Sequence, residues 1–122
     1  MNILLDTHVL LWHLTDNPRL SLEYSAIIED PQHRKFFSIV SFWEMAIKTS
    51  SGKLKLERSL STLLPTEINV LTLSLAHIER VQQLPFYHRD PFDRAIIAQA
   101  LTEDMALLSV DRSFAAYGVQ LV

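Results

Sequence analysis

Four carboxylates lie at or near the predicted starts of helices. They are Asp6, Glu44, Asp93 and Asp111. Brought together, they would form an oxygen-only ligand set of the kind that hard divalent cations prefer. A Mg²⁺ or Mn²⁺ ion held in this way would orient a water and stabilise negative charge on a phosphodiester. The acids therefore indicate a metal-dependent phosphoryl-transfer or nuclease site.

Three of these acids follow predicted strands. The strands are expected at 2–5, 36–40 and 106–110, and Asp6, Glu44 and Asp111 come after them in that order. Parallel strands place their carboxyl ends on one edge of a sheet, where α/β proteins bind ligands. We therefore expect these three acids at the same edge. Asp93 is placed less directly, because it opens a helix that has no obvious strand before it.

Each acid also has a structural explanation. Asp6 and Asp111 could cap the helices that follow them. Ser41 and Glu44 match a capping box, with Ser41 as N-cap. Asp93 lies at the third position of its helix, where a negative charge suits the macrodipole. Capping is the better interpretation of any one acid alone, whereas the metal site is favoured by all four together.

The remaining pattern predicts the elements that position the acids. Helices are expected at 7–14, 21–30, 42–50, 74–84 and 91–101, with a helical turn at 111–117, a third strand at 69–73 and an edge strand at 119–122. Asp90 is the expected N-cap of the helix at 91–101, with Pro91 at its first position. Strands alternating with helices predict an α/β fold with a parallel sheet, in one domain covering residues 1–122.

Composition narrows the class of protein. Hydrophobic residues make up 48% of the chain and charged residues 20%, as in ordinary globular proteins. No apolar run approaches the roughly 18 residues of a membrane span, and no signal-peptide pattern is seen. The chain has no cysteine, which excludes disulfides and thiolate metal sites. We expect a cytoplasmic protein.

Charge is informative through its distribution. The net charge of −3 provides no overall basic field. Basic residues nevertheless gather in one stretch: Arg34, Lys35, Lys48, Lys53, Lys55 and Arg58. The stretch is either a set of solvated helix faces or a flank that contacts phosphates.

Other catalytic motifs are missing. Ser50-Ser-Gly-Lys53 lacks the upstream glycine of a P-loop, and no nucleotide-binding glycine motif, nucleophile elbow or zinc-protease motif occurs. The histidines show no metal-ligand spacing, so we interpret His8 and His88 as packing residues. Trp12, Phe42 and Trp43 are expected in the core.

Four segments in series resemble the PIN-domain ribonucleases, and most closely the VapC-like toxins of bacterial toxin–antitoxin pairs. They are Leu5-Asp-Thr-His-Val-Leu-Leu-Trp12, Ser41-Phe-Trp-Glu-Met-Ala-Ile-Lys48 with Gly52-Lys-Leu54, His88-Arg-Asp-Pro-Phe-Asp-Arg-Ala-Ile-Ile-Ala-Gln-Ala100, and Leu108-Ser-Val-Asp-Arg-Ser-Phe114. Ser109 stands where the family often has threonine, a change that keeps a hydroxyl.

The resemblance implies a Rossmann-like three-layer α/β/α sandwich with a mainly parallel sheet. It implies that an Mg²⁺ or Mn²⁺ ion is held by the family's four acids, which fall on Asp6, Glu44, Asp93 and Asp111. Asp93 takes the metal role rather than Asp90, because it directly precedes the buried helical run. A cognate antitoxin, an RNA substrate and a homodimer are the implied partners.

The leading hypothesis is therefore a metal-dependent endoribonuclease that acts as the toxin of a toxin–antitoxin pair. Lys48, Arg94 or Arg112 could steady the RNA backbone, or could be surface charges or partners of the acids. One alternative is an antitoxin-binding module with negligible catalysis. Another is a metal-dependent phosphatase, which the lack of a second aspartate two residues after Asp6 disfavours.

Overall fold

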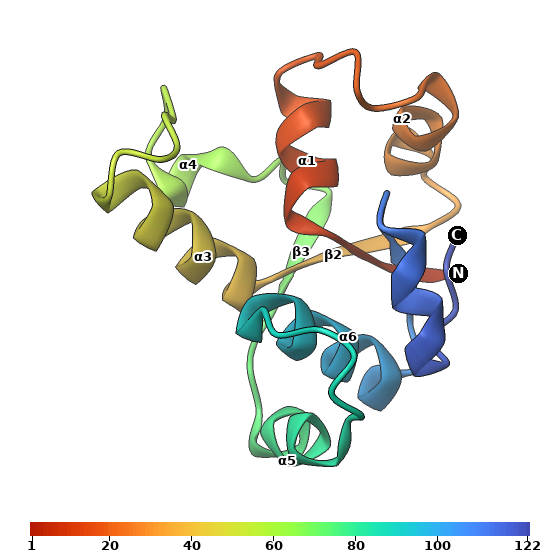
Figure 1. Cartoon of the computed structure of the whole chain (residues 1–122). Helices are drawn as coiled ribbons and strands as arrows, with labels where there is room; N and C mark the ends of the chain where they lie inside the picture. Colours follow the sequence, from red (N-terminus) through yellow and green to blue (C-terminus); the bar gives the residue numbers. More distant parts are fainter.

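The sheet is built from the most apolar short runs of the chain. The computed structural model describes residues 1–122 and contains four strands: β1 (Asn2–Leu5), β2 (Arg34–Ser38), β3 (Ile68–Leu71) and β4 (Ala106–Leu108). The strand order is β3-β2-β1-β4, and every neighbouring pair is parallel (Figure 1). β1 is therefore a central strand, and all four strands end at the same edge.

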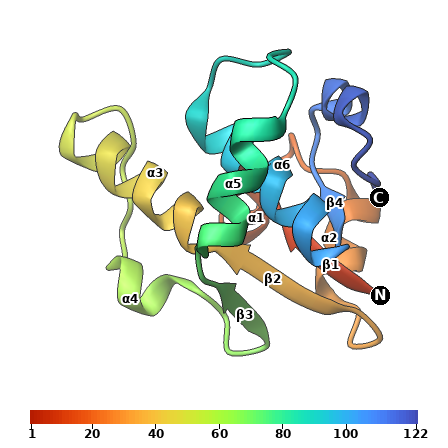
Figure 2. The same cartoon turned by 90° about the horizontal axis from the view of Figure 1, so that it is seen from below.

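Helices cover both faces of this sheet. They are α1 (Thr7–Leu14), α2 (Leu22–Glu29), α3 (Ile39–Ser50), α4 (Leu60–Leu63), α5 (Leu75–Gln83), α6 (Pro91–Glu103) and the 3₁₀ helix η1 (Arg112–Tyr117). Figure 1 shows α1 and α2 on one side of the strands and α5 and α6 on the other, and Figure 2 shows α5 lying beside α6. None of these helices has the length and apolar character needed to cross a membrane.

Alternation along the strands divides the core into two layers. Ile3 and Leu5 point into a cluster with residues of α1, α2 and α4, whereas Leu4 points into a cluster with α6 and η1. All three side chains are fully buried. Because successive side chains of a strand point to opposite faces, an entirely apolar strand must be covered on both. The prediction of a three-layer α/β/α arrangement with a parallel sheet is confirmed.

The second strand lies two residues earlier than predicted. It covers Arg34–Ser38 instead of 36–40, because Asn2–Leu5 pairs in parallel register with residues 34–37. Lys35 is buried within it, and its ammonium donates a hydrogen bond of 2.7 Å to the carbonyl of Asp30. This hydrogen bond gives the buried ammonium a partner and allows a lysine to stand in an inner strand.

The start of α3 moves with that strand. Ser38 is its N-cap, and the Ser38 hydroxyl accepts a hydrogen bond from the Val40 amide. The predicted capping box of Ser41 and Glu44 is therefore wrong, since both residues lie inside the helix. Glu44 is thus free of a capping role.

Four further elements differ from the prediction. β3 is Ile68–Leu71 rather than 69–73, and β4 ends at Leu108 rather than at residue 110. The expected edge strand at 119–122 is reduced to one bridge between Leu107 and Leu121. α6 continues to Glu103, and Asp104 ends it in the left-handed conformation at φ 54°.

Candidate acidic metal centre

Asp6 is held rigidly at the end of the central strand. Its side chain is almost fully buried; Oδ1 accepts from the Thr7 amide at 2.8 Å, and Oδ2 accepts from the Ser109 hydroxyl at 2.7 Å. Burial raises the pKa of Asp6 above its ordinary value, and the hydrogen bonds from Ser109 and Thr7 lower it in part. Nearby Glu44 raises the pKa of Asp6 further. The carboxylate is therefore fixed in orientation and sensitive to its acidic neighbour.

Glu44 reaches the same place from α3. It is buried, and Oε2 forms an ion pair of 2.8 Å with the ammonium of Lys48, one helical turn later. The Thr7 hydroxyl lies 2.9 Å from Oε1 of Glu44 and 2.7 Å from the hydroxyl of Ser41. Thr7 thus connects the residue after Asp6 to Glu44, and the two acids share one hydrogen-bonded frame.

Asp93 and Asp90 lie at the start of α6. Asp90 is the N-cap, as predicted: its Oδ1 accepts from the amides of Phe92 at 2.8 Å and Asp93 at 3.2 Å. The Asp93 carboxylate has no hydrogen-bond partner of its own, and it is half-buried. Asp93 is therefore the acid of this pair whose side chain is not used by the helix.

The pKa of Asp93 shows that this residue lies near the other acids. The pKa of Asp93 is raised to about 7, first by burial and then by the neighbouring carboxylates, in the order Asp90, Asp6, Glu44 and Asp111. Like charges raise each other's pKa only over short distances in a partly desolvated space. The four predicted acids are therefore gathered in one region, although they come from four separate parts of the chain.

Asp111 is the exposed member of the set. It is the N-cap of η1, and its Oδ1 accepts from the Ser113 amide at 3.0 Å. Its own amide donates to the hydroxyl of Ser109 at 3.1 Å, and that same hydroxyl donates to Asp6. Ser109 therefore joins Asp111 and Asp6 through one buried side chain.

The donor chemistry fits a hard divalent cation. Every candidate ligand is a carboxylate, and their mutual repulsion would be relieved by a positive ion. No three His, Asp or Glu side chains are drawn close enough together to form a complete ligand cluster. The residues fit the ion in chemistry and location, whereas they are not closed around a central point.

The three predicted basic residues have different positions. Lys48 is the partner of a site carboxylate, and its hydrogen bond to Glu44 raises the pKa of Lys48, with nearby Asp90 and Asp93 adding to the shift. Arg94 is buried instead: its guanidinium donates to the carbonyls of Pro85 at 2.9 Å and Val81 at 3.1 Å. The suggestion that Arg94 steadies RNA or pairs with an acid is wrong, because it secures the end of α5. Arg112 is exposed and donates to the Val122 carbonyl.

The histidines and aromatic residues largely pack as expected. The ring of His88 packs against Phe114, and Phe42 packs against Phe37. His8 is exposed and touches only the ring of Trp12, so its interpretation as a packing residue holds in part. Trp43 is a clear exception, since 60% of it is exposed. It meets Phe92 edge-on at the starts of α3 and α6, so the expectation that Trp43 lies in the core is wrong.

Sequence reasoning overlooked one contributor to the site and one buried structural histidine. Thr7 stands directly after Asp6, and the position of its hydroxyl beside Glu44 had no signal in either segment alone. His77 is buried and accepts from the Ser74 amide at 3.0 Å, completing a capping box that the sequence disguises. Its other ring nitrogen lies 2.7 Å from Glu103, which ties α5 to the last residue of α6.

Solved structures with the same fold cover this chain almost completely. VapBC2 from Rickettsia felis bound to a promoter DNA fragment superposes with a TM-score of 0.76 at 14% identity, covering 100% of this chain and 98% of that one. VapBC-1 from nontypeable Haemophilus influenzae gives 0.70 at 19% identity, covering 100% and 97%. A toxin–antitoxin complex from Klebsiella pneumoniae gives 0.63 at 21% identity, covering 93% and 90%.

The sequence itself matches a family model. Comparison with curated proteins found no match. The model described as the PIN domain matches residues 3–120, which includes all four acids and the whole sheet except Asn2 at the start of β1. The chain therefore belongs to the PIN-domain family.

Proposed function

We propose that this protein is a metal-dependent endoribonuclease that acts as the toxin of a toxin–antitoxin pair. The observation that carries the proposal is the gathering of Asp6, Glu44, Asp93 and Asp111 in one region, where burial raises the pKa of Asp93 and the surrounding carboxylates add to the shift. Neutral Ser or Asn residues would cap helices without this repulsion. Membership of a family whose members are generally nucleases supports the same conclusion.

Asp6, Glu44, Asp93 and Asp111 are the proposed ligands of a Mg²⁺ ion, with Mn²⁺ as a substitute. Because these carboxylates are not closed around one point, we expect part of the contact to run through water molecules. When bound, the ion would supply Lewis-acid activation of water and stabilise charge on the phosphodiester.

The residues of the chain have separate tasks in this proposal. Ser109 and Thr7 hold the two oxygens of Asp6 in place, so that its remaining lone pairs face the site. Lys48 compensates the charge of the buried Glu44 carboxylate through their ion pair of 2.8 Å. Asp93 holds a proton near neutral pH in the metal-free protein and releases it when a cation enters.

Partners are proposed from the structural relatives. The VapBC and toxin–antitoxin structures are complexes by their own description. We propose that this chain also binds a cognate antitoxin, which covers the acidic site, and that it forms a homodimer.

RNA cleavage by matched variants tests the enzyme. Wild type should cut a mixed RNA pool with Mg²⁺ or Mn²⁺ and stop cutting in EDTA. Asp6→Asn, which keeps the shape of the side chain, should lose at least about a hundredfold in rate, as expected when a metal ligand is removed. Glu79→Gln on the exposed face of α5 is the control and should cut like wild type.

The alternatives give different outcomes. If Asp6→Asn and wild type cut equally, or neither cuts at any divalent concentration, the nuclease proposal fails. An antitoxin-binding module would then be indicated by stable complex formation without cleavage. A phosphatase would release inorganic phosphate from a monoester and leave internal phosphodiesters intact.

A further inference from the structure

A groove lies next to the four acids. This groove, of about 370 Å³, separates α1 from the segment that follows α3. At one end it is lined by Thr7 and Lys48, the two residues that contact Glu44. From there the groove continues along α1 to Lys55, which also lines the adjoining cavity of about 440 Å³. The groove therefore leads directly out of the candidate metal centre.

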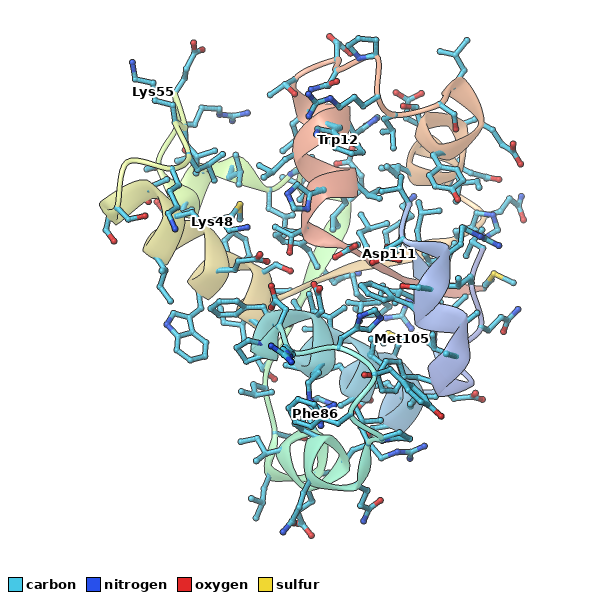
Figure 3. The ribbon with its side chains drawn as sticks, viewed as in Figure 1. Trp12, Lys48, Lys55, Phe86, Met105 and Asp111 are labelled. Atoms are coloured by element: carbon cyan, nitrogen blue, oxygen red, sulfur yellow. The ribbon has the colours of Figure 1, made fainter.

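Its lining carries positive charge and no acid. Lys48, Lys53 and Lys55 contribute three ammonium groups, and the rest of the lining is neutral or histidine. Lys53 and Lys55 are exposed, and neither forms an ion pair with an acid. Figure 3 shows Lys48 on α3 and Lys55 beyond the end of that helix, with Trp12 on α1. This basic character stands out in a chain whose net charge is −3.

The lysines are mounted on a defined backbone. Gly52 ends α3 with a φ of 76°, and the amides of Lys53 and Leu54 both donate to the Lys48 carbonyl, at 2.9 and 3.2 Å. Leu54 and Leu56 pack against the core cluster that contains Leu5 and Leu10. Since alternate residues of this segment are anchored inward, Lys53 and Lys55 are held outward without needing a helix.

The opposite wall is suited to sugars and bases. It presents the hydroxyls of Thr7 and Thr15, the amide of Asn17, and the rings of His8 and Trp12. The two rings lie 5.8 Å apart between centroids. Aromatic faces beside cations are the combination by which proteins bind single-stranded nucleic acids without reading their sequence.

We propose that this groove binds the phosphate backbone of single-stranded RNA, with Lys53 and Lys55 contacting phosphates on one side of the cleaved bond. This inference rests on the proposed nuclease function. The phosphates of an RNA chain are repelled by the four carboxylates. Positive side chains next to the acids are therefore needed to bind the RNA. An acidic protein segment is less favoured, because the ring faces and hydroxyls next to the lysines suit nucleotides better than carboxylates.

The basic stretch expected from the sequence is thereby divided. Arg34 and Lys35 lie at the start of β2, at the sheet edge opposite the acids, and Lys35 is buried. Lys48, Lys53 and Lys55 lie at the acidic edge. Only the second group is assigned to RNA.

Binding without cleavage tests the groove. A short fluorescein-labelled oligouridine is titrated, in EDTA, with full-length Asp6→Asn protein and with the same protein carrying Lys53→Glu and Lys55→Glu. The dependence of log Kd on log salt should become shallower by about 1.4, from about 0.7 for each of two lost phosphate contacts. The change in this salt dependence should be similar for oligoadenosine, since phosphates carry no sequence information.

A control of equal charge separates the groove from the overall field. Arg34→Glu with Arg80→Glu changes the net charge by the same amount at two distant positions, and it should leave the salt dependence near that of the parent. Circular dichroism melting checks that both double variants fold. Lys53→Gln with Lys55→Gln provides a milder form of the test, with the same direction and a smaller loss.

The outcomes distinguish the groove from the enzyme. If the lysine variants bind RNA like the parent while wild type cuts RNA, the groove is not the RNA-binding site, and the proposed nuclease activity is supported. If the lysines are needed for RNA binding but no divalent ion supports cleavage, the groove is an RNA-binding site and the proposed nuclease activity is contradicted. If charge reversal weakens capture of a purified antitoxin and leaves RNA binding unchanged, the groove is a protein site and this proposal is overturned.

Discussion

The hydroxyl of Ser109 donates a hydrogen bond of 2.7 Å to Oδ2 of Asp6, across 103 residues of sequence. Ser109 is fully buried just beyond β4, and Asp6 lies just beyond β1. The two strands are paired in parallel, with Leu5 opposite Leu108. This contact fixes the orientation of the central acid from the neighbouring strand.

Removing that hydroxyl should change the ionisation of Asp6. The hydrogen bond from Ser109 lowers the pKa of Asp6 against the effect of burial, so in Ser109→Ala the pKa should rise further. Cleavage that needs the ionised carboxylate would then be lost at a higher pH than in wild type. Carboxyl NMR titration of the metal-free protein measures the first effect, and a pH–rate profile measures the second. Ser109→Thr keeps a hydroxyl and should titrate like wild type; an unchanged Asp6 titration in Ser109→Ala contradicts the assignment.

Asp93 should make the metal-free protein less stable as pH rises. Its pKa is about 7 in the folded protein, whereas the ordinary value for Asp, taken for the unfolded chain, is 3.8. Between these pH values the folded protein binds one proton more than the unfolded chain. The free energy of unfolding should therefore fall as pH rises from about 4 to about 7, and this contribution should be constant above that range. Asp93→Asn should remove the dependence and melt higher than wild type at about pH 8.

A divalent ion should reverse this ranking. The proposed Mg²⁺ ion would relieve the repulsion among the acids and bind only the folded site, so it should raise the melting temperature of wild type more than that of Asp93→Asn. Thermal melting with and without Mg²⁺ at about pH 8 measures both effects. Equal melting shifts in the two proteins would show that Asp93 lies outside the cation site.

Lys48 should affect metal and RNA in opposite directions. Its ammonium lies 2.8 Å from Glu44, where it would compete with the proposed metal ion for the same carboxylate. Lys48→Gln should therefore tighten Mg²⁺ binding a few-fold in calorimetry, while RNA binding in EDTA weakens. Lys53→Gln is the matched control, since it should weaken RNA binding and leave Mg²⁺ affinity unchanged. Weaker Mg²⁺ binding by Lys48→Gln would instead mean that the lysine is required to position Glu44.

Gln99 should be important for stability behind the site. The buried Ser38 hydroxyl donates to its Oε1, and its Nε2 donates to the Thr72 carbonyl at 3.3 Å. Gln99→Leu keeps the approximate size of the side chain and leaves both partners unsatisfied, so it should lower the free energy of unfolding by about 1–3 kcal/mol. Urea denaturation measures the change. Gln120→Ala, at an exposed position, should stay within about 0.5 kcal/mol, and similar losses in both variants would contradict the role of the buried network.

Local pattern was sufficient for most of the architecture. The apolar run at Asn2–Leu5, the Asp90-Pro91 start of α6 and the alternation of strands with helices depend on neighbouring residues alone. They predicted a parallel α/β fold, and they placed Asp6 and Asp111 after strands and Asp93 at its helix start. A helix cap or a buried strand depends on a few neighbouring residues, so it can be predicted from the sequence alone.

What the sequence could not determine depends on contacts between distant segments. The register of β2 against β1 moved the start of α3 to Ile39 and released Glu44 from a capping box. The burial of Arg94 and the exposure of Trp43 were decided by how α5, α3 and α6 meet. The lysines after α3 became one wall of a groove only when α1 was placed opposite them. Charge and residue type are local properties, whereas burial, pKa and proximity arise only when the chain is folded.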